Sequence, residues 1–441
     1  MAERGLILAA PASGSGKTLI AAGLLRHLWR RGMRVAAAKS GPDYIDPTFH
    51  TAASGRPCIN LDVWAMRPAT IAGLVAALEA DAELVLCEGV MGLFDGTGPD
   101  GETGSTAALA HFTGWPVVLV VDTRGQGASA AALIAGFARH DPTLRLAAII
   151  FNRVAGPRHR AMLEAALARY LPGLPCLGAV PQQAELALPE RHLGLVPAGE
   201  TTVAEAVLER AAAAVESAID IDWLIGLARA SSSGCAVPTV LLPPLGQRIA
   251  VARDDAFLFA YPAVLEGWRR EGVALSFFSP LADESPDPHA DAVYLPGGYP
   301  ELHAGRLATA ERLLAGLRDA AAAGKALYGE CGGYMVLGEA LTDADGRTHR
   351  MAGLLPLVTS FAERRLHLGY RALTLLQDGP LGPAGSRYRG HEFHYATTIS
   401  ASDDGALFAV TDPWGADLGT AGLRRGSVAG SFIHLVDRED G

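Results

Sequence analysis

Cysteine is scarce in this 441-residue sequence, and its cysteines stand far apart. No C-x-x-C pair is present, so the sequence offers neither the usual zinc-binding spacing nor a redox dithiol. This usage is typical of a reducing compartment, and we expect a cytoplasmic protein. The five positions are Cys58, Cys87, Cys176, Cys235 and Cys331.

Long apolar runs and an excess of basic residues are also lacking. No uncharged apolar stretch reaches the roughly 18 residues of a membrane span, so we expect no membrane partner. The net charge is -10, which does not favour the phosphate attraction that nucleic-acid binding requires. We therefore expect a small-molecule partner and no nucleic acid, and we allow for a homodimer.

The composition is rich enough in apolar residues to bury large cores. Apolar residues make up 49% and charged residues 19%, which argues against disorder. Because domains usually hold about 100–200 residues, this length predicts two of them. The proline- and serine-containing stretch SSSGCAVPTVLLPPLGQ breaks the periodic pattern. It divides the chain into a first domain 1–230, a linker 231–247 and a second domain 248–441.

Short β-rich apolar runs alternate with Ala- and Leu-rich amphipathic stretches in the first domain. This alternation predicts an α/β fold with a doubly wound parallel sheet, and a second α/β unit follows the linker. The expected strands are Leu6–Ala10, Val35–Ala38, Glu83–Cys87, Val117–Val121 and Ala147–Phe151, then Arg248–Ala252, Ala274–Phe278, Ala292–Leu295 and Ala326–Tyr328. The expected helices are Thr18–Arg31, Pro68–Glu79, Ser129–Arg139, Pro157–Tyr170 and Arg306–Ala323.

A glycine loop follows the first predicted strand. It reads Gly-Ser-Gly-Lys-Thr and precedes a helix, so backbone N–H groups and the helix dipole favour a bound polyphosphate. Pro11 replaces the first glycine of the full phosphate-loop pattern, and a plain tight turn is the alternative. Lys17 would reach the β- and γ-phosphates, and the Thr18 hydroxyl would bind Mg²⁺. The predicted ATP-binding residues here are Gly14, Ser15, Gly16, Lys17 and Thr18.

Polar residues follow other predicted strands of the same sheet. Glu88 ends a buried strand at the edge where a carboxylate meets a metal, so we predict that it binds Mg²⁺. Asp43, as a metal ligand, and Asp46 and Asp95, as substrate contacts, lie in turn-rich segments, where simple turn chemistry is the alternative. The Asn152 amide would pair with adenine or cap a turn.

Cys331 lies at the apex of a predicted strand-turn-helix elbow. The sequence Gly-Glu-Cys-Gly-Gly follows an apolar strand, and small neighbours let a substrate carbonyl approach backbone N–H donors. We predict that Cys331 is a nucleophile and that His434, in a short β-rich run, is its base. Gly298 and Gly332 would form the oxyanion hole, with a simple turn as the alternative for Gly298.

Together these segments resemble the cobyrinic acid and hydrogenobyrinic acid a,c-diamide synthases of corrinoid biosynthesis, over nearly the whole chain. The resemblance rests on the joint occurrence of GSGKT at Gly14–Thr18, KSGPDYIDPTFH at Lys39–His50, EGVMGLFDG at Glu88–Gly96, LPGGYPE, YGECGGY and RGHEFHY at Arg389–Tyr395. In that family the first half looks like dethiobiotin synthetase and binds ATP. The second half is a class I glutamine amidotransferase domain.

The resemblance implies successive amidation of two acetate side chains of a corrinoid polycarboxylate. ATP and Mg²⁺ would activate each carboxylate as an acyl phosphate, and L-glutamine would be hydrolysed at Cys331 to supply ammonia. The resemblance also implies that Asp43, Tyr44, Ile45 and Asp95, with Glu88, lie among the metal and substrate contacts. It does not distinguish cobalt-containing from metal-free corrinoids.

The sequence departs from common glutaminase patterns at two positions. Many class I glutaminase domains have a glutamate two residues after the histidine, whereas this chain has Val436. The group that orients His434 is therefore not identified by the sequence. The usual elbow also ends in glutamine, and Met335 stands there in this chain.

Two alternatives remain open at this point. The acceptor would be another tetrapyrrole acid, such as a nickel sirohydrochlorin or cobyric acid, or the chain would be a partner-regulated ATPase switch without an amidation reaction. A basic cluster before the GHEFHY segment would suit a polycarboxylate, although charged runs usually form solvated faces. The cluster comprises Arg364, Arg365, His367 and Arg371.

Overall fold

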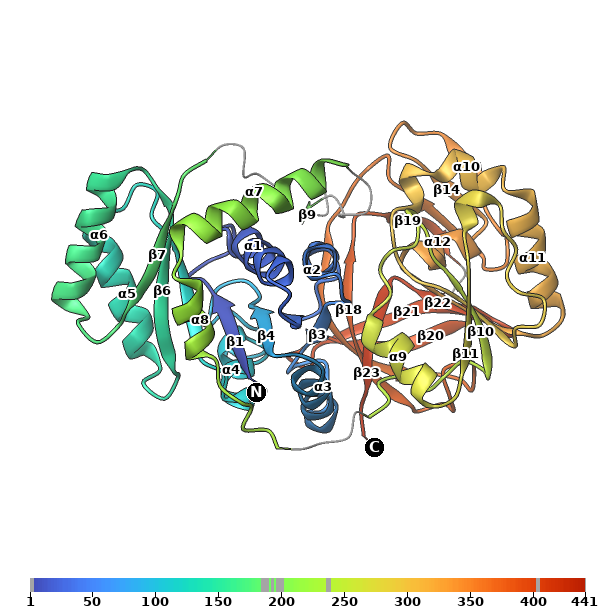
Figure 1. Ribbon diagram of the computed structural model, residues 1–441. Coiled ribbons are helices and arrows are strands. Elements are labelled where there is room, and N and C mark those ends of the chain that lie inside the picture. The colour runs from blue at the N-terminus through green and yellow to red at the C-terminus, as the bar shows by residue number, and fades with distance from the viewer. Residues whose placement is uncertain are drawn as a thin grey trace. The chain divides into compact units, whose positions relative to one another are not determined.

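The computed structural model describes residues 4–183, 190–191, 194–195, 202–234, 239–401 and 405–440. The chain divides into two compact units (Figure 1). Unit 1 comprises Met1–Trp64 and Pro68–Thr239, and unit 2 comprises Ala65–Arg67 and Val240–Gly441. Four residues of the predicted linker, 235–238, lie outside the described residues.

Unit 1 is built on a seven-stranded parallel sheet with the order β3-β2-β4-β1-β5-β6-β7. Leu6, Ile7 and Leu8 of the central β1 are all fully buried, so both faces of the sheet are covered. This confirms the doubly wound architecture. The strands are β1 (Gly5–Ala9), β2 (Val35–Ser40), β3 (Ile59–Leu61), β4 (Leu84–Glu88), β5 (Val117–Asp122), β6 (Leu146–Val154) and β7 (Cys176–Pro181).

Eight helices accompany this part of the chain within its described residues. α1 packs against α7 (Figure 1), and the approach is close, since a Cβ on Gly23 would lie 2.7 Å from the Ala211 carbonyl oxygen. The helices are α1 (Lys17–Arg30), α2 (Asp46–Ser54), α3 (Pro68–Asp81), α4 (Thr106–Thr113), α5 (Ser129–His140), α6 (Pro157–Tyr170), α7 (Thr202–Ala218) and α8 (Ile221–Leu227). A two-residue pair, β8 (Glu190–Arg191) and β9 (Gly194–Leu195), precedes α7.

Unit 2 contains a ten-stranded mixed sheet with the order β11-β10-β12-β13-β22-β21-β20-β17-β18-β23. Its first five strands are parallel and the remaining pairings are antiparallel. The strands are β10 (Arg248–Ala252), β11 (Ala274–Phe278), β12 (Ala292–Leu295), β13 (Ala326–Glu330), β17 (His367–Leu375), β18 (Arg387–His394), β20 (Ala406–Thr411), β21 (Asp417–Arg425), β22 (Val428–Ser431) and β23 (Ile433–Arg438).

A smaller four-stranded sheet and short helices complete unit 2. The small sheet is formed by β14 (Ala340–Thr342), β15 (Thr348–Arg350), β16 (Leu357–Ser360) and β19 (Thr397–Ala401). The helices are α9 (Pro262–Arg270), α10 (Ala304–Ala308), α11 (Glu311–Ala322) and α12 (Gly332–Leu337), with 3₁₀ turns at Pro280–Ala282 and Pro300–Leu302. Leu295, Leu327 and Leu337 are fully buried in the core between these layers.

The single helix predicted over Arg306–Ala323 is wrong. The structure has two helices there, α10 and α11, separated at Thr309 and Ala310. Ala310 has φ -78° and ψ 79°, which is not helical. The Asp283 carboxylate accepts the Leu313 N–H at 2.9 Å, so a side chain distant in sequence satisfies the first turn of α11.

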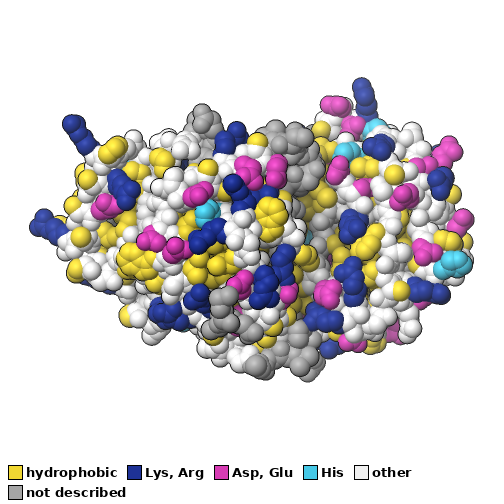
Figure 2. Space-filling model, viewed as in Figure 1, with side chains coloured by type: hydrophobic (Ala, Val, Ile, Leu, Met, Phe, Trp, Pro, Cys, Tyr) yellow, Lys and Arg dark blue, Asp and Glu magenta, His cyan; other side chains and the backbone are white. Residues whose placement is uncertain are grey.

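Within the described residues, no helix combines the length and the apolar character that crossing a membrane requires. Figure 2 shows acidic and basic side chains interspersed on the visible face of each unit.

Gly333, at the start of α12, gives a test of the packing in unit 2. A Cβ at this position would lie 2.0 Å from the Leu295 carbonyl oxygen, so α12 cannot keep its place against β12 with a larger residue. We expect Gly333→Ala to destabilise unit 2 by about 1–3 kcal/mol. Calorimetric unfolding checks this, with Gly136→Ala in the exposed middle of α5 as the control. That change adds a Cβ in open space and should be neutral or stabilising.

Candidate active sites

The phosphate loop of unit 1 joins β1 to α1. Gly14 and Gly16 have φ values of 74° and 86°, in the left-handed region that glycine adopts without strain. Ser15 Oγ donates to the Ala12 carbonyl at 2.7 Å and stabilises the turn. α1 begins at Lys17, so its free N–H groups and its dipole face the loop. The strand, loop and helix of a phosphate site are therefore present.

Asn152 and Arg153 connect β6 to this loop. Asn152 Nδ2 donates to the Ser15 carbonyl at 2.8 Å, and Arg153 Nη1 donates to the Gly14 carbonyl at 2.7 Å. β6 includes Asn152 instead of ending before it, because Asn152 pairs with Asp122 on β5. The amide thus supports the loop backbone, and its pairing with adenine stays a prediction.

Lys17 extends toward the segment that follows β4. Its Nζ donates to the Met91 carbonyl at 2.5 Å, and Met91 itself has a φ of 44°. Burial lowers the pKa of Lys17 to about 8, although the Glu88 carboxylate opposes this shift. An ammonium has three N–H donors, so Lys17 retains donors for phosphate oxygens while it binds Met91.

Three side chains with oxygen ligands meet beside Lys17. Thr18 Oγ1 lies 2.7 Å from Glu88 Oε1 and 3.3 Å from Asp46 Oδ2. Hydroxyl and carboxylate oxygens are the ligands that Mg²⁺ prefers, so this donor set fits the ion. Asp46, the predicted substrate contact, belongs to the set together with the two predicted metal ligands Thr18 and Glu88.

The sequence reasoning missed two residues that neutralise Glu88. Lys39 Nζ lies 3.2 Å from Glu88 Oε2 and 2.6 Å from Asp46 Oδ2. His50 Nε2 lies 2.5 Å from Glu88 Oε2. Burial raises the pKa of Glu88, but Lys39 and His50 outweigh burial and hold it far below its usual value. A lysine at the end of the apolar run Val35–Ala38 was the available signal, since a buried ammonium requires partners.

Asp43 and Asp95 form hydrogen bonds within their own turns. Asp43 Oδ1 accepts the Ile45 N–H at 2.8 Å, and Asp95 Oδ2 accepts the Gly92 N–H at 2.9 Å. Such bonds are the turn chemistry considered above. Burial, with the nearby Asp46, raises the pKa of Asp43. The metal role of Asp43 and the substrate role of Asp95 stay predictions.

A cavity of about 710 Å³ adjoins the phosphate loop. It gives room beside the loop for a ligand larger than the phosphates themselves. The predicted substrate residues Tyr44 and Ile45 are buried elsewhere in unit 1 and do not line it. Its lining residues are Pro11, Ala12, Ser13, Gly14, Ser15, Asp122, Arg124, Gly125, Gln126, Leu133 and Phe137.

Cys331 of unit 2 occupies a strained turn between β13 and α12. Its φ of 45° and ψ of -101° are rarely adopted by a residue with a side chain. Its N–H donates to the Ser431 carbonyl of β22 at 2.8 Å, which fixes the turn. Burial, with a smaller effect of Glu301, raises the pKa of the Cys331 thiol. The predicted elbow is present, and its thiol requires a base.

His434 lies beside Cys331 across Gly297. A Cβ added to Gly297 would stand 2.9 Å from His434 Nε2 and 3.2 Å from Cys331 Cβ. β12, β13 and β22 are neighbours in the sheet, so the segments that follow them meet at one edge. His434 is fully buried, and burial lowers its pKa to about 3. The imidazole is therefore neutral and keeps a lone pair, and it becomes an effective base only when a partner stabilises the charge of the imidazolium.

Gly298 and Gly332 bring two backbone amides close to the thiol. A Cβ on Gly332 would stand 3.0 Å from the Gly298 nitrogen, so the two segments are in contact. The Gly332 N–H interacts with Cys331 and opposes the upward shift of its pKa by burial. This arrangement suits an oxyanion hole, and the role of both amides stays a prediction.

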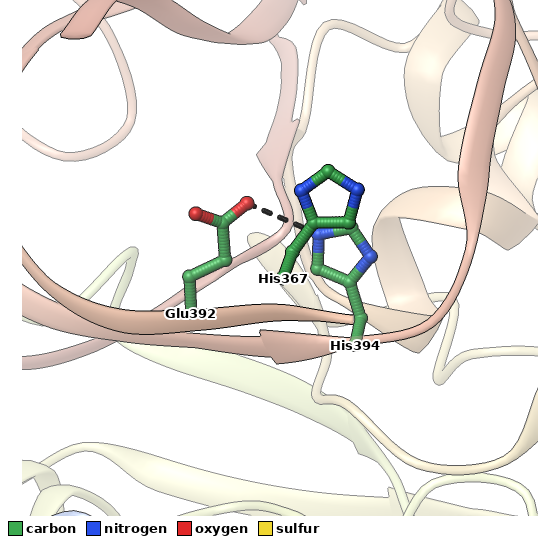
Figure 3. A group of neighbouring side chains, drawn as sticks. All are labelled: His367, Glu392 and His394. Carbon is green, nitrogen blue, oxygen red and sulfur yellow. Dashed lines mark hydrogen bonds and ion pairs between the residues drawn. The ribbon is translucent and has the colours of Figure 1, made fainter. Parts of the chain in front are cut away.

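His367, Glu392 and His394 gather on β17 and β18, with ligand atoms within 4.8 Å of one another (Figure 3). Glu392 Oε1 pairs with His394 Nε2 at 3.0 Å, and Glu392 Oε2 pairs with Arg371 at 2.7 Å. His394 Nδ1 also lies 3.1 Å from the Ala396 carbonyl oxygen. Glu392 already has His394 and Arg371 as partners, so the group is an ion-pair network in this structure.

Two family descriptions match the two halves of the chain. The CobQ/CobB/MinD/ParA nucleotide binding domain matches residues 6–196, and the CobB/CobQ-like glutamine amidotransferase domain matches residues 248–440. Three similar proteins share one name, hydrogenobyrinate a,c-diamide synthase. The proteins of Brucella anthropi and Rhodobacter capsulatus are each 55% identical to this chain, over 98% of this chain and 98% of the relative. The protein of Rhizobium meliloti is 53% identical, over 98% of this chain and 99% of the relative.

The chain belongs to the hydrogenobyrinate a,c-diamide synthase family. This confirms the resemblance that the sequence motifs indicated, and the two family matches confirm the predicted pair of folds. Solved structures match less well: PurLQS from Thermotoga maritima aligns at 18% identity over 43% of this chain and 87% of that chain, with a TM-score of 0.31. A similarity of that size carries no argument.

Lys17→Ala tests the phosphate loop. We expect it to abolish amide synthesis from both glutamine and ammonium, because either nitrogen source depends on the same activated carboxylate. The measurement is product formation with each source at saturating ATP. Lys325→Ala is the control, since Lys325 is a partly exposed lysine of unit 2 that donates to the Pro288 carbonyl. Turnover of ammonium by Lys17→Ala at the normal rate would contradict the assignment.

Cys331→Ala tests the glutaminase site. Removing the thiol should lower the rate of glutamine hydrolysis by at least about 10³-fold, and ammonium-dependent synthesis should stay within about twofold of normal. Glutamate release and amide formation are followed in parallel. Cys176→Ala, at a partly exposed cysteine of unit 1, should change neither. Loss of both activities in Cys331→Ala, with normal folding, would refute a separate nitrogen-supplying site.

Proposed function

We propose that this enzyme uses ATP and L-glutamine to amidate the a- and c-acetate carboxylates of a corrinoid acid. The joint presence of a phosphate loop with an oxygen donor set and a cysteine elbow with a buried histidine carries the proposal. The name shared by the relatives favours the metal-free acceptor hydrogenobyrinate over cobyrinate. The homodimer and the cytoplasmic setting stay predictions from the sequence.

Carboxylate activation belongs to unit 1 in this proposal. A carboxylate is a poor electrophile, so one of its oxygens attacks the γ-phosphorus of ATP, ADP leaves, and an acyl phosphate forms. Lys17 and the loop N–H groups hold the phosphates in place. Mg²⁺ bound by Thr18, Glu88 and Asp46 would offset the charge on the phosphate oxygens. Ammonia then attacks the acyl carbon, and phosphate leaves with the electrons of the C–O bond.

Nitrogen release belongs to unit 2. His434 takes the thiol proton of Cys331, and the thiolate attacks the side-chain amide carbon of glutamine to form a tetrahedral intermediate. Gly298 and Gly332 stabilise its oxyanion through their N–H groups. The C–N bond then breaks as His434 returns the proton to nitrogen, and ammonia leaves. Water hydrolyses the remaining thioester to glutamate and restores the thiol.

Glutamine hydrolysis assists amide synthesis because free ammonia is mostly protonated to ammonium at neutral pH and is then no nucleophile. Release from a buried site supplies unprotonated ammonia, which is useful only if it reaches the acyl phosphate before it meets bulk water.

The exposed Arg364 and Arg365 would attract the polycarboxylate acceptor electrostatically, which is the role proposed for the basic cluster.

Product mass spectrometry tests the proposed function directly. Purified enzyme with ATP, Mg²⁺ and glutamine is incubated separately with hydrogenobyrinate, cobyrinate and a nickel sirohydrochlorin. The expected product is hydrogenobyrinate that has lost about 2 Da, through two replacements of a hydroxyl by an amino group, with fragments that place both amides on the a and c acetates. Amidation of the nickel compound alone, or ATP hydrolysis with no amide product from any acceptor, would refute the proposal.

A further inference from the structure

The group that orients His434 comes from an unexpected position in the chain. Val436, two residues after His434, is apolar and fully buried, so it cannot bind an imidazole N–H. We propose that Glu330, the residue immediately before the nucleophile Cys331, is the positioning carboxylate for His434. This inference rests on the proposed roles of Cys331 and His434, and it adds a residue and a function for it.

The two nitrogens of His434 face different partners. Nδ1 lies 3.9 Å from Glu330 Oε2. Nε2 and the Cβ of Cys331 both lie close to the position that a Cβ on Gly297 would occupy, so Nε2 is near the nucleophile. A carboxylate at Nδ1 selects the tautomer with its proton on that nitrogen. Nε2 is then left with the lone pair that accepts the thiol proton. The order carboxylate, imidazole, thiol is that of a nucleophile with its base and an orienting third group.

Glu330 is held in place by two hydrogen bonds. The Tyr294 hydroxyl donates to Oε2 at 2.8 Å, and the Leu435 N–H donates to Oε1 at 3.1 Å. Leu435 follows His434 directly on β23, so the same bond fixes the backbone that carries the imidazole. With Glu330 only 1% exposed, carboxylate and histidine are positioned together by the end of β13 and the start of β23.

The charge of Glu330 also suits this role. Burial raises the pKa of Glu330 to about 7, against the effect of Tyr294 and Leu435. When the thiol proton moves to His434, the imidazolium formed favours the ionised carboxylate. A buried carboxylate without a cationic partner is costly, and this step supplies the partner at the moment when the thiolate forms.

The present separation of 3.9 Å is longer than a hydrogen bond. A decrease of about 1 Å brings Nδ1 and Oε2 into normal range, and catalytic hydrogen bonds often shorten only when substrate binds. The inference therefore predicts that the bond forms with the thiolate and imidazolium pair, where it contributes to reaction rate rather than to the resting fold.

Other titratable groups surround the pair and have to be separated from Glu330. Glu301, which follows β12, and Glu392 on β18 act on the Cys331 thiol, together with Glu330 itself. Burial, with His391 and His394 on β18, lowers the pKa of His434, and a hydrogen bond with the Phe259 backbone opposes this shift. The hydroxyls of Tyr294 and Tyr328 lie close to Glu330. A test of Glu330 therefore needs a second carboxylate and histidine pair of the same unit as its reference.

The pH dependence of Cys331 alkylation by iodoacetamide is the measurement. The full-length enzyme is compared with Glu330→Gln, Glu330→Asp and Tyr294→Phe. Glu330→Gln removes the charge that stabilises the imidazolium and thiolate pair, so the thiol should lose its proton at higher pH. We expect the midpoint to rise and kcat/KM for glutamine to fall about 10²-fold, with ammonium-dependent synthesis unchanged. Glu330→Asp keeps the negative charge, so its alkylation midpoint and its kcat/KM should lie between those of the normal enzyme and those of Glu330→Gln. Tyr294→Phe should lose less kcat/KM than Glu330→Gln.

Asp343→Asn is the matched control. Asp343 pairs with His349 at 2.7 Å in the small sheet of unit 2, so this variant breaks a carboxylate and histidine pair away from Cys331. It should leave the alkylation midpoint and glutamine hydrolysis unchanged. Thermal unfolding of every variant shows whether a loss of activity follows a loss of fold.

The outcomes separate this inference from the proposed function. An unchanged alkylation midpoint and normal glutamine hydrolysis in folded Glu330→Gln would overturn the positioning role, while lost hydrolysis in Cys331→Ala and His434→Ala would leave the proposed function intact. Normal hydrolysis in Cys331→Ala would instead refute the function itself. If Glu330→Gln unfolds, an unchanged midpoint in both Tyr294→Phe and Glu330→Asp overturns the role.

Discussion

A buried carboxylate at the carboxyl end of a central parallel strand organises the chemistry of each unit. Glu88 ends β4 in unit 1, and Glu330 ends β13 in unit 2, each about 1% exposed. A carboxylate removed from water needs hydrogen bonds or cations around it, and the parallel strands bring those groups to the same edge. In unit 1 the partners are Lys39, His50 and Thr18, and in unit 2 they are Tyr294, the Leu435 N–H and, through His434, the thiol site.

The two sites lie at the same kind of sheet edge but differ in how their side chains are charged. Unit 1 concentrates opposite charges, so that Glu88 stays ionised beside the hydroxyl of Thr18, a donor set that suits a divalent cation and phosphates. In unit 2 the Cys331 thiol and the His434 imidazole are neutral at rest, because burial disfavours both the thiolate and the imidazolium. The thiolate and the imidazolium form together when the proton moves from Cys331 to His434. Such a difference fits one site for phosphoryl transfer and another for nucleophilic attack on an amide.

The sequence predicted the fold where local pattern and turn chemistry agree. Apolar runs marked the parallel strands of both units, and the glycines around Lys17 and Cys331 marked the two turns. It failed where contacts between distant residues decide the outcome. The break before α11 depends on Asp283 meeting Leu313, which no local pattern reports. Lys39 stood out only as a lysine at the end of an apolar run, and its partners, like those of His50 and Glu330, become recognisable only once the strands are side by side. Because Val436 occupies the usual glutamate position after His434, the sequence did not point to Glu330, which precedes Cys331.

The central claim is that nitrogen released at Cys331 is the nitrogen incorporated at the Lys17 site. The most direct measurement uses glutamine labelled with ¹⁵N in its side-chain amide together with an excess of unlabelled ammonium, and determines the isotope content of the corrinoid amides by mass spectrometry. The account predicts mainly ¹⁵N in both new amides of the normal enzyme and only ¹⁴N in Cys331→Ala. Amides that carry ¹⁴N in proportion to the ammonium present, in the normal enzyme, would contradict it.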